Sequence, residues 1–178
     1  MENIFKPKDA DRRFLWGNLG DIKEGRAYLG EEMPVVVYRL MQFTIRDVLI
    51  NKFGREMADE IFRGAGLTAG KEFAKNALNL QVDFENFVAG LQKALSDLKV
   101  GVLRIEQMSD NAGEITLTVS EDLDCSGLPI LDEVVCIYDE GFIAGILEVY
   151  TGKPYDVREI DCWGTGDRTC RFKCSVCV

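Results

Sequence analysis

Six cysteines dominate the chemistry that this sequence offers, and four of them crowd into its last 17 residues. Two of the four, Cys162 and Cys170, flank a glycine-rich turn in a predicted hairpin, which brings both sulfur atoms within reach of one ion. Glu159 lies three residues before Cys162, so a bulge or a strand end must separate them if both are to face one ion. Cys136, near the start of a predicted helix, completes a set of three thiolates and one carboxylate. Such a closed set suits a structural zinc ion, so the predicted metal ligands are Cys136, Glu159, Cys162 and Cys170.

Other interpretations of the same cysteines remain open. A buried cysteine can serve as a small hydrophobic side chain without any metal. The tail from Cys170 through Cys174 to Cys177 has the C-x₃-C-x₂-C spacing of some iron–sulfur proteins, but strand alternation would turn Cys177 away from the other two. The sequence therefore favours zinc over an iron–sulfur cluster. Cys174 and Cys177 remain as possible secondary thiols, that is, thiols outside the predicted metal site. Cys125 falls in a predicted loop and is expected to bind no metal.

The composition argues against several classes of function. The chain has 178 residues, with 21 Lys and Arg against 30 Asp and Glu, a net charge of −9, and no histidine. The absence of histidine excludes histidine-dependent catalysis, histidine-ligated haem and histidine-containing zinc sites. The acidic balance argues against a nucleic-acid surface and against a polybasic membrane patch. The sequence also contains no dinucleotide glycine fingerprint and no evident nucleophile–base pair, so an enzyme has little support.

Hydrophobic spacing predicts the elements that must position these residues. The predicted helices and strands are helices over 34–53, 55–76, 84–98 and 133–150, and strands over 100–108, 114–120, 155–162 and 169–176. This order predicts an α+β fold, in which a helical N-terminal half packs on a four-stranded antiparallel sheet and a helix is inserted between two hairpins. Residues 1–33 would form an N-terminal extension and residues 34–178 a ligand-binding domain. Gly64, Gly66 and Gly70 interrupt the second helix, which favours the close approach of another backbone.

Apolar stripes on the third and fourth predicted helices provide candidates for a binding pocket. Pockets in folds of this kind lie between helix and sheet and are lined by aromatic and aliphatic side chains. A stripe of this kind forms ordinary core more often than a pocket. The candidate pocket residues are Phe87, Leu91, Ile146, Val149 and Tyr150.

A family resemblance rests on the C-terminal part of the chain. Its motifs are Cys136, then Glu140-Gly-Phe-Ile-Ala-Gly-Ile-Leu147, then Arg158-Glu-Ile-Asp-Cys-Trp-Gly-Thr-Gly-Asp-Arg-Thr-Cys-Arg-Phe172. Through these motifs the chain resembles the vinyl-4-reductase domain family, over roughly residues 34–176. The resemblance implies a zinc ion bound by three cysteines and one glutamate, which match the four ligands chosen above. It also implies a homodimer, an internal pocket for small apolar molecules, and a fold related to vesicle-tethering subunits and haem-based gas sensors. Phenol-sensing members hold the hydroxyl with a pocket histidine, which this chain lacks.

These observations predict a zinc-stabilised binding module for a small hydrophobic molecule, with a sensory or carrier role. One alternative is a scaffold or assembly subunit that acts through dimer surfaces. Another is a tetrapyrrole vinyl reductase or its accessory protein. Because the sequence shows no signal peptide and no membrane-spanning run, we expect a cytoplasmic protein. The expected partners are a small hydrophobic ligand and a second copy of the chain, without direct nucleic-acid binding or membrane insertion.

Overall fold

The computed structural model describes residues 13–109 and 113–177. It divides after Glu32 into two compact units, which are described separately. The first contains a short 3₁₀ helix, η2 (Trp16–Leu19), and one turn of α-helix, α1 (Ile22–Gly25). Asp21 caps α1 by accepting a hydrogen bond from the backbone N–H of Glu24 at 2.9 Å. The division of the chain into an N-terminal extension, residues 1–33, and a ligand-binding domain, residues 34–178, stays a prediction.

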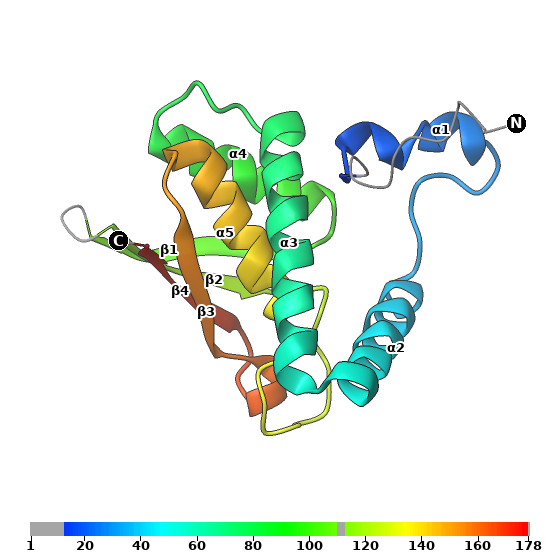
Figure 1. The fold of residues 1–178 in the computed structure, drawn as a ribbon. Helices are drawn as coiled ribbons and strands as arrows, with labels where there is room; N and C mark the ends of the chain where they lie inside the picture. Colours follow the sequence, from blue (N-terminus) through cyan, green and yellow to red (C-terminus); the bar gives the residue numbers. More distant parts are fainter. Residues whose placement is uncertain (1–12, 110–112, 178) are drawn as a thin grey trace, which may run out of the picture. The chain divides into compact units, whose positions relative to one another are not determined.

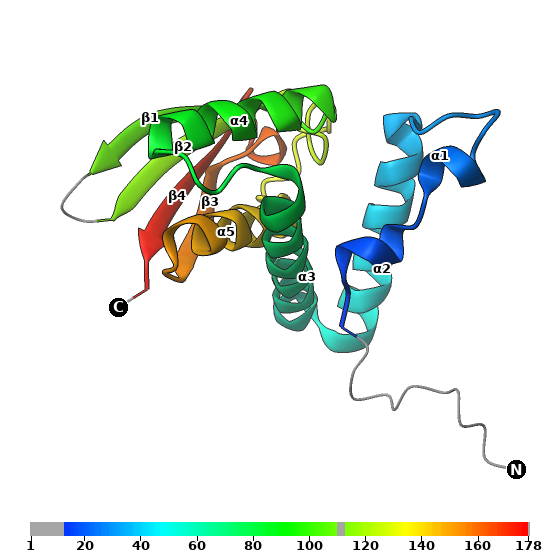
Figure 2. The ribbon, with the colours of Figure 1, turned by 90° about the horizontal axis from the view of Figure 1, so that it is seen from above.

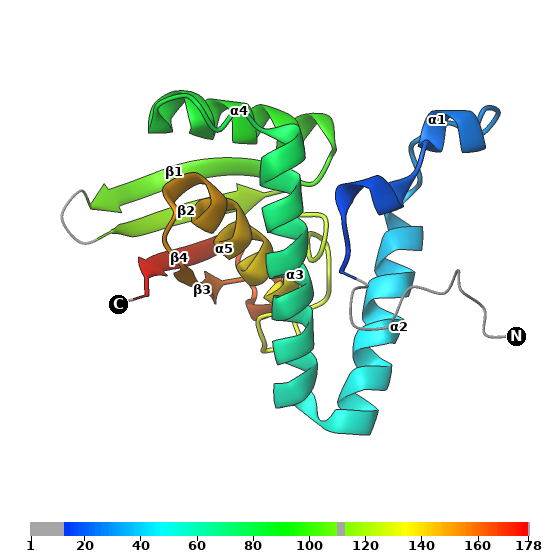
Figure 3. The ribbon, with the colours of Figure 1, turned by 45° about the horizontal axis from the view of Figure 1, so that its top comes forward.

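The second unit has the α+β architecture that the sequence predicts (Figure 1). Its elements are α2 (Val35–Phe53), α3 (Arg55–Ala77), α4 (Phe84–Asp97), β1 (Val102–Ser109), β2 (Glu114–Ser120), α5 (Ile137–Thr151), β3 (Tyr155–Asp161), η3 (Trp163–Thr165) and β4 (Cys170–Val176). The described strands form one sheet in the order β1-β2-β4-β3, with every neighbouring pair antiparallel. Helices α4 and α5 lie over one face of this sheet, and α3 runs alongside α5 (Figures 2 and 3). The hydrophobic core, which includes the fully buried Phe87, Ile146 and Phe172, fills the space between these helices and the sheet.

The start of α5 differs from the prediction in a way that matters for the cysteines. The helix was expected to begin near Glu133, but it begins at Ile137, with Cys136 as its N-cap. The preceding segment leaves helical geometry because Asp132 adopts a left-handed conformation with φ 56°. Backbone N–H groups of Leu131 and Asp132 both donate to the carbonyl of Gly164. The loop is thereby tied to η3, and Cys136 stands at the end of the helix that faces the last hairpin.

Helices α3 and α5 approach each other through glycines on both sides. A Cβ atom at Gly66 would lie 2.0 Å from the Tyr138 carbonyl oxygen, and one at Gly70 would lie 2.1 Å from that of Phe142. The same holds on α5, where a Cβ at Gly141 would lie 2.0 Å from the Arg63 carbonyl oxygen. The predicted close approach is thus confirmed for Gly66 and Gly70. It is wrong for Gly64, where a Cβ would meet no atom within 4 Å.

Candidate functional site

Four buried thiols meet at one point in the core. The sulfur atoms of Cys125, Cys136, Cys162 and Cys170 all lie within 4.8 Å of one another. The Sγ atoms of Cys125 and Cys170 are 3.1 Å apart, and Cys136 Sγ lies 3.7 Å from Cys170 Sγ and 3.9 Å from Cys162 Sγ. These four side chains could hold a metal ion, since buried sulfur ligands from four cysteines form a closed structural site.

The last hairpin supplies two of the thiols. Cys170 is the first residue of β4, and Cys162 follows β3 as the N-cap of η3. The backbone N–H of Gly164 donates to Cys162 Sγ at 3.4 Å, which suits a sulfur that carries negative charge. Hydrogen bonds from the thiols of Cys125, Cys136 and Cys170 pull the pKa of Cys162 below its usual value. The cluster therefore favours a thiolate at Cys162, the form that binds metals.

Cys125 joins the cluster from a loop that the sequence analysis expected to bind no metal. Side chains of Asp122 and Arg39 both hold this loop. The Asp122 carboxylate accepts hydrogen bonds from the backbone N–H groups of Asp124 at 2.8 Å and Cys125 at 3.2 Å. The Arg39 guanidinium of α2 donates to the carbonyls of Leu123 at 2.7 Å and Ser126 at 2.9 Å. An aspartate three residues before a cysteine is the sequence feature that points to this turn.

Glu159 lies beside the thiols, at the position that the sequence predicts. A register shift between Glu159 and Asp161 interrupts the pairing of β3 with β4, which is the bulge required to bring Glu159 and Cys162 to one side. The Glu159 Oε2 atom accepts a hydrogen bond from the Cys136 backbone N–H at 3.1 Å, and its buried Oε1 has no partner among the described residues. Burial raises the pKa of Glu159 to about 8. A buried carboxylate oxygen without a donor is the arrangement that a bound cation would satisfy.

The remaining two cysteines lie elsewhere. Cys174 is buried within β4, opposite Ile115 and Val157, and burial raises the pKa of its thiol to about 12. Cys177 is exposed. The structure therefore does not bring the C-x₃-C-x₂-C residues together in the described part of the chain; of the three, only Cys170 belongs to the thiol cluster.

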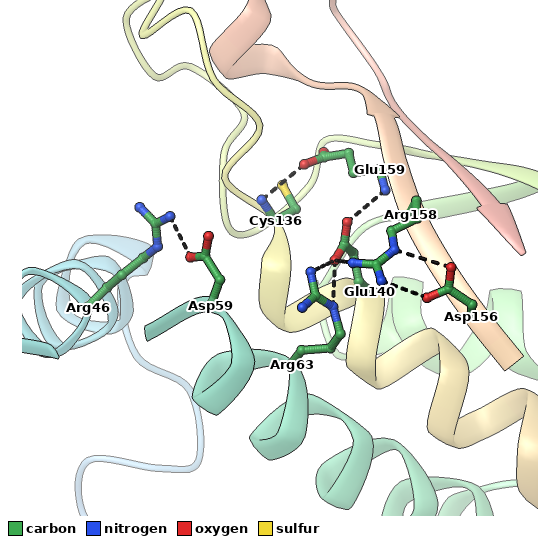
Figure 4. A network of polar contacts seen from close by, with 8 residues as sticks. All are labelled: Arg46, Asp59, Arg63, Cys136, Glu140, Asp156, Arg158 and Glu159. Carbon is green, nitrogen blue, oxygen red and sulfur yellow. Dashed lines mark hydrogen bonds and ion pairs between the residues drawn. The ribbon is translucent and has the colours of Figure 1, made fainter. Parts of the chain in front are cut away.

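A buried ion network fixes the strand that carries Glu159 (Figure 4). The Glu140 carboxylate of α5 accepts from Arg63 Nε at 2.9 Å and Nη2 at 2.5 Å. Its other oxygen, Oε1, accepts the backbone N–H of Glu159 at 2.9 Å, while Arg158 Nη1 lies 3.9 Å from Oε2, the oxygen that pairs with Arg63. Three elements, α3, α5 and β3, are thus joined through one carboxylate directly beside the thiol cluster.

Replacing this carboxylate should weaken the fold. We expect Glu140→Gln to lower the free energy of unfolding by about 2 kcal/mol, because it removes the buried charge that pairs with Arg63. Urea denaturation measures the change. The matched control is Glu148→Gln, which breaks the half-exposed Lys71–Glu148 pair between the same two helices and should cost about 1 kcal/mol or less. Equal losses in the two variants would contradict the role given to Glu140.

An interior cavity lies between α4, α5 and the sheet. Its volume is about 40 Å³, more than one ordered water needs. Two of the residues that line it, Asp122 and Asp139, are polar, and the others are apolar. Among the predicted pocket residues, Phe87, Leu91 and Ile146 line the cavity. Val149 and Tyr150 do not line it, although the Tyr150 ring stacks on Phe87 at 3.8 Å between centroids.

Three aspartates surround the junction between the cavity and the thiols. The Asp122 carboxylate lies 3.8 Å from Cys136 Sγ, and burial raises the pKa of Asp122 to about 7. Burial, together with the nearby Cys162 thiolate, raises the pKa of Asp124, and burial, together with the neighbouring carboxylates, raises the pKa of Asp139. Sequence analysis missed these residues, since none stands in a recognisable motif. The site therefore combines acidic groups and thiols at one end with an apolar cavity at the other.

Comparisons with known proteins agree with this architecture. Residues 115–176 match the family model of the vinyl-4-reductase domain. The chain is 31% identical over 145 residues to the uncharacterized protein MJ1642 of Methanocaldococcus jannaschii, which covers 82% of this chain and 79% of that protein. In the described part of the chain, no helix has the length and apolar character needed to cross a membrane.

Two solved structures share the fold. The phenol-responsive sensory domain of the transcription activator PoxR, solved with phenol, superposes with a TM-score of 0.63 at 16% identity over 88% of this chain and 90% of that one. A vinyl-4-reductase family protein from Methanocaldococcus jannaschii gives a TM-score of 0.60 at 18% identity, over 93% of this chain and 98% of that one. The family-model match and the shared fold lead to the same assignment: the chain belongs to the vinyl-4-reductase domain family.

Proposed function

We propose that this protein is a zinc-stabilised binding module for a small hydrophobic molecule, with a sensory or carrier role in the cytoplasm. The observation that carries the proposal is the apolar cavity between α4, α5 and the sheet. Protein interiors are close-packed, and a cavity with apolar walls gives water few partners. This space adjoins a wider cleft at Val100, Asp139 and Phe142, so a small apolar ligand that occupies both would regain the contacts that the empty cavity lacks. The PoxR domain, which shares the fold, was solved with phenol.

The donor set beside the cavity fits a zinc ion. Cys136, Cys162 and Cys170 would supply three thiolates, and the fourth ligand would be Cys125 or the predicted Glu159. The four thiols within 4.8 Å of one another favour Cys125, and the unpartnered Oε1 of Glu159 supports a carboxylate. Bound zinc would supply a cross-link among the loop before α5, the helix itself and the last hairpin. A reducing compartment would keep these thiols available for it.

A homodimer would account for the surface of α2. Large apolar side chains on this helix are exposed in the single chain, among them Val36 at 68% and Leu40 at 67%. A contiguous apolar helix face in water usually marks a contact with another protein surface. This observation also favours the second candidate function, a scaffold or assembly subunit that acts through such a surface.

Native mass spectrometry of gently purified protein tests the proposal. We expect a dimer that carries about one zinc ion per chain, together with a retained small molecule that dissociates at higher collision energy. The binding of ethylbenzene, used as an apolar probe, should then weaken about tenfold or more in Ile105→Phe, because the larger ring enters the cavity. Ile160→Phe, at an exposed position of β3, is the matched control and should bind like the wild type. Metal-free wild-type protein that does not bind ethylbenzene would refute the proposal.

A further inference from the structure

A second, larger cavity opens between α2, α3 and α5. Its volume is about 470 Å³, and nine of its lining residues are apolar, including Met41, Ile45 and Phe62. Asp139, Phe142 and Val100 line both this cleft and the interior cavity, so the two meet at these side chains. The cleft is large enough for the apolar body of a small organic molecule.

Gln42 presents an acceptor without a donor to this cleft. The side chain is only 9% exposed. Its Nε2 donates to Asp124 Oδ2 at 2.5 Å, and the other Asp124 oxygen accepts from the Tyr38 hydroxyl at 2.8 Å. Because a carboxylate accepts and does not donate, the amide nitrogen of Gln42 must face Asp124. This orientation leaves the buried Oε1 as an acceptor, and it has no partner among the described residues.

Asp139 presents a second unsatisfied acceptor in the same cleft. No hydrogen bond or ion pair to its carboxyl group comes from the residues that the structure describes. None of the described lining residues is a lysine or an arginine. Two nearby cations lie outside the lining. Arg39 donates to backbone carbonyls of the loop that carries Cys125, and Arg46 pairs through Nη2 with Asp59 at 2.8 Å, although its buried Nε has no partner among the described residues. The Tyr138 hydroxyl, which also lines the cleft, can donate or accept.

We propose that this cleft binds a small organic amine in its protonated form. The apolar body lies against the side chains of α2 and α3. The ammonium group donates to the Asp139 carboxyl group, which the positive charge of the ligand holds in the ionised form, and Gln42 Oε1 accepts a hydrogen bond from the same ligand. A cation supplies both the donors and the positive charge that the acidic lining lacks, and hydrogen bonds between two charged groups are the strong ones. This inference rests on the proposed function, since it names the chemical class of the hydrophobic ligand.

Isothermal titration of the intact, metal-loaded protein at neutral pH tests the ligand class with three probes of similar shape: benzylamine, benzyl alcohol and benzoate. We expect benzylamine to bind about tenfold or more tightly than benzyl alcohol, and benzoate to bind more weakly than either. Asp139→Asn should reduce the preference for the amine to about threefold or less, and Gln42→Leu should weaken benzylamine binding about tenfold. Asp97→Asn removes an exposed carboxylate of α4 outside the cleft and should preserve the preference.

The possible failures are distinguishable. Equal affinity for benzylamine and benzyl alcohol in the wild type overturns the amine assignment and leaves the hydrophobic-binding function intact. An amine preference that persists in a folded Asp139→Asn variant also overturns it. Circular dichroism shows whether each variant folds. Where one does not, the affinities of the wild type for benzylamine and benzyl alcohol still decide the question. If the wild type binds neither compound and also fails with ethylbenzene, the proposed function falls together with this inference.

Discussion

Replacing Cys162 by serine is expected to abolish metal binding and to unfold the domain. Cys162 is the thiol whose pKa the cluster lowers, and it also caps η3. Zinc that binds only the folded chain adds its binding free energy to stability, and that contribution can match the whole stability of a domain, about 5–15 kcal/mol. Elemental analysis should find about one zinc ion per wild-type chain and none in Cys162→Ser. A thermal scan should show that the variant has lost its cooperative transition.

The exposed Cys177 provides the matched control. Cys177→Ser removes a thiol outside the cluster and should keep both the zinc and the melting temperature of the wild type. Cys162→Ser protein that retains one zinc ion per chain would contradict the proposed site. Cobalt substitution then identifies the fourth ligand, because each thiolate adds to the sulfur-to-metal charge-transfer band. Cys125→Ser should weaken this band if Cys125 binds the metal, whereas Glu159→Gln should leave its intensity unchanged.

Gly66→Ala is expected to disrupt the close crossing of α3 and α5. The added methyl group would lie 2.0 Å from the Tyr138 carbonyl oxygen and 2.9 Å from the Phe142 backbone nitrogen, so α3 and α5 must separate. We expect the free energy of unfolding to fall by about 3 kcal/mol or more, since overpacking against backbone has no flexible side chain to absorb it. Equilibrium urea denaturation measures this loss.

Gly64→Ala is the control in the same helix. Nothing lies within 4 Å of the added atom, so the substitution should change only helix propensity and stabilise the protein by about 1 kcal/mol or less. Opposite signs for the two alanine substitutions are therefore expected. If both destabilise the protein equally, the helix crossing does not depend on close backbone contact at Gly66.

Much of the architecture could be predicted from local patterns. Strict alternation over 114–120 identified β2 with its observed bounds, and Asp83, the residue before α4, caps that helix by accepting a hydrogen bond from the Asn86 backbone N–H. The spacing from Glu159 to Cys162 required a bulge, and the register shift lies there. These features follow from sequence because strand alternation, helix capping and turn chemistry act over a few residues.

The position of the fourth thiol and the cleft between α2, α3 and α5 both depend on contacts between distant segments. Cys125 reaches the cluster because Arg39, on the distant helix α2, holds its loop, and no periodicity links the two. Gln42 and Asp139 belong to α2 and α5 and share a cleft only after the helices have packed. The sequence by itself determined the α+β order of elements and placed three thiols and Glu159 near one hairpin. Tertiary structure decided which buried polar atoms lack partners, because that depends on long-range packing rather than on local spacing.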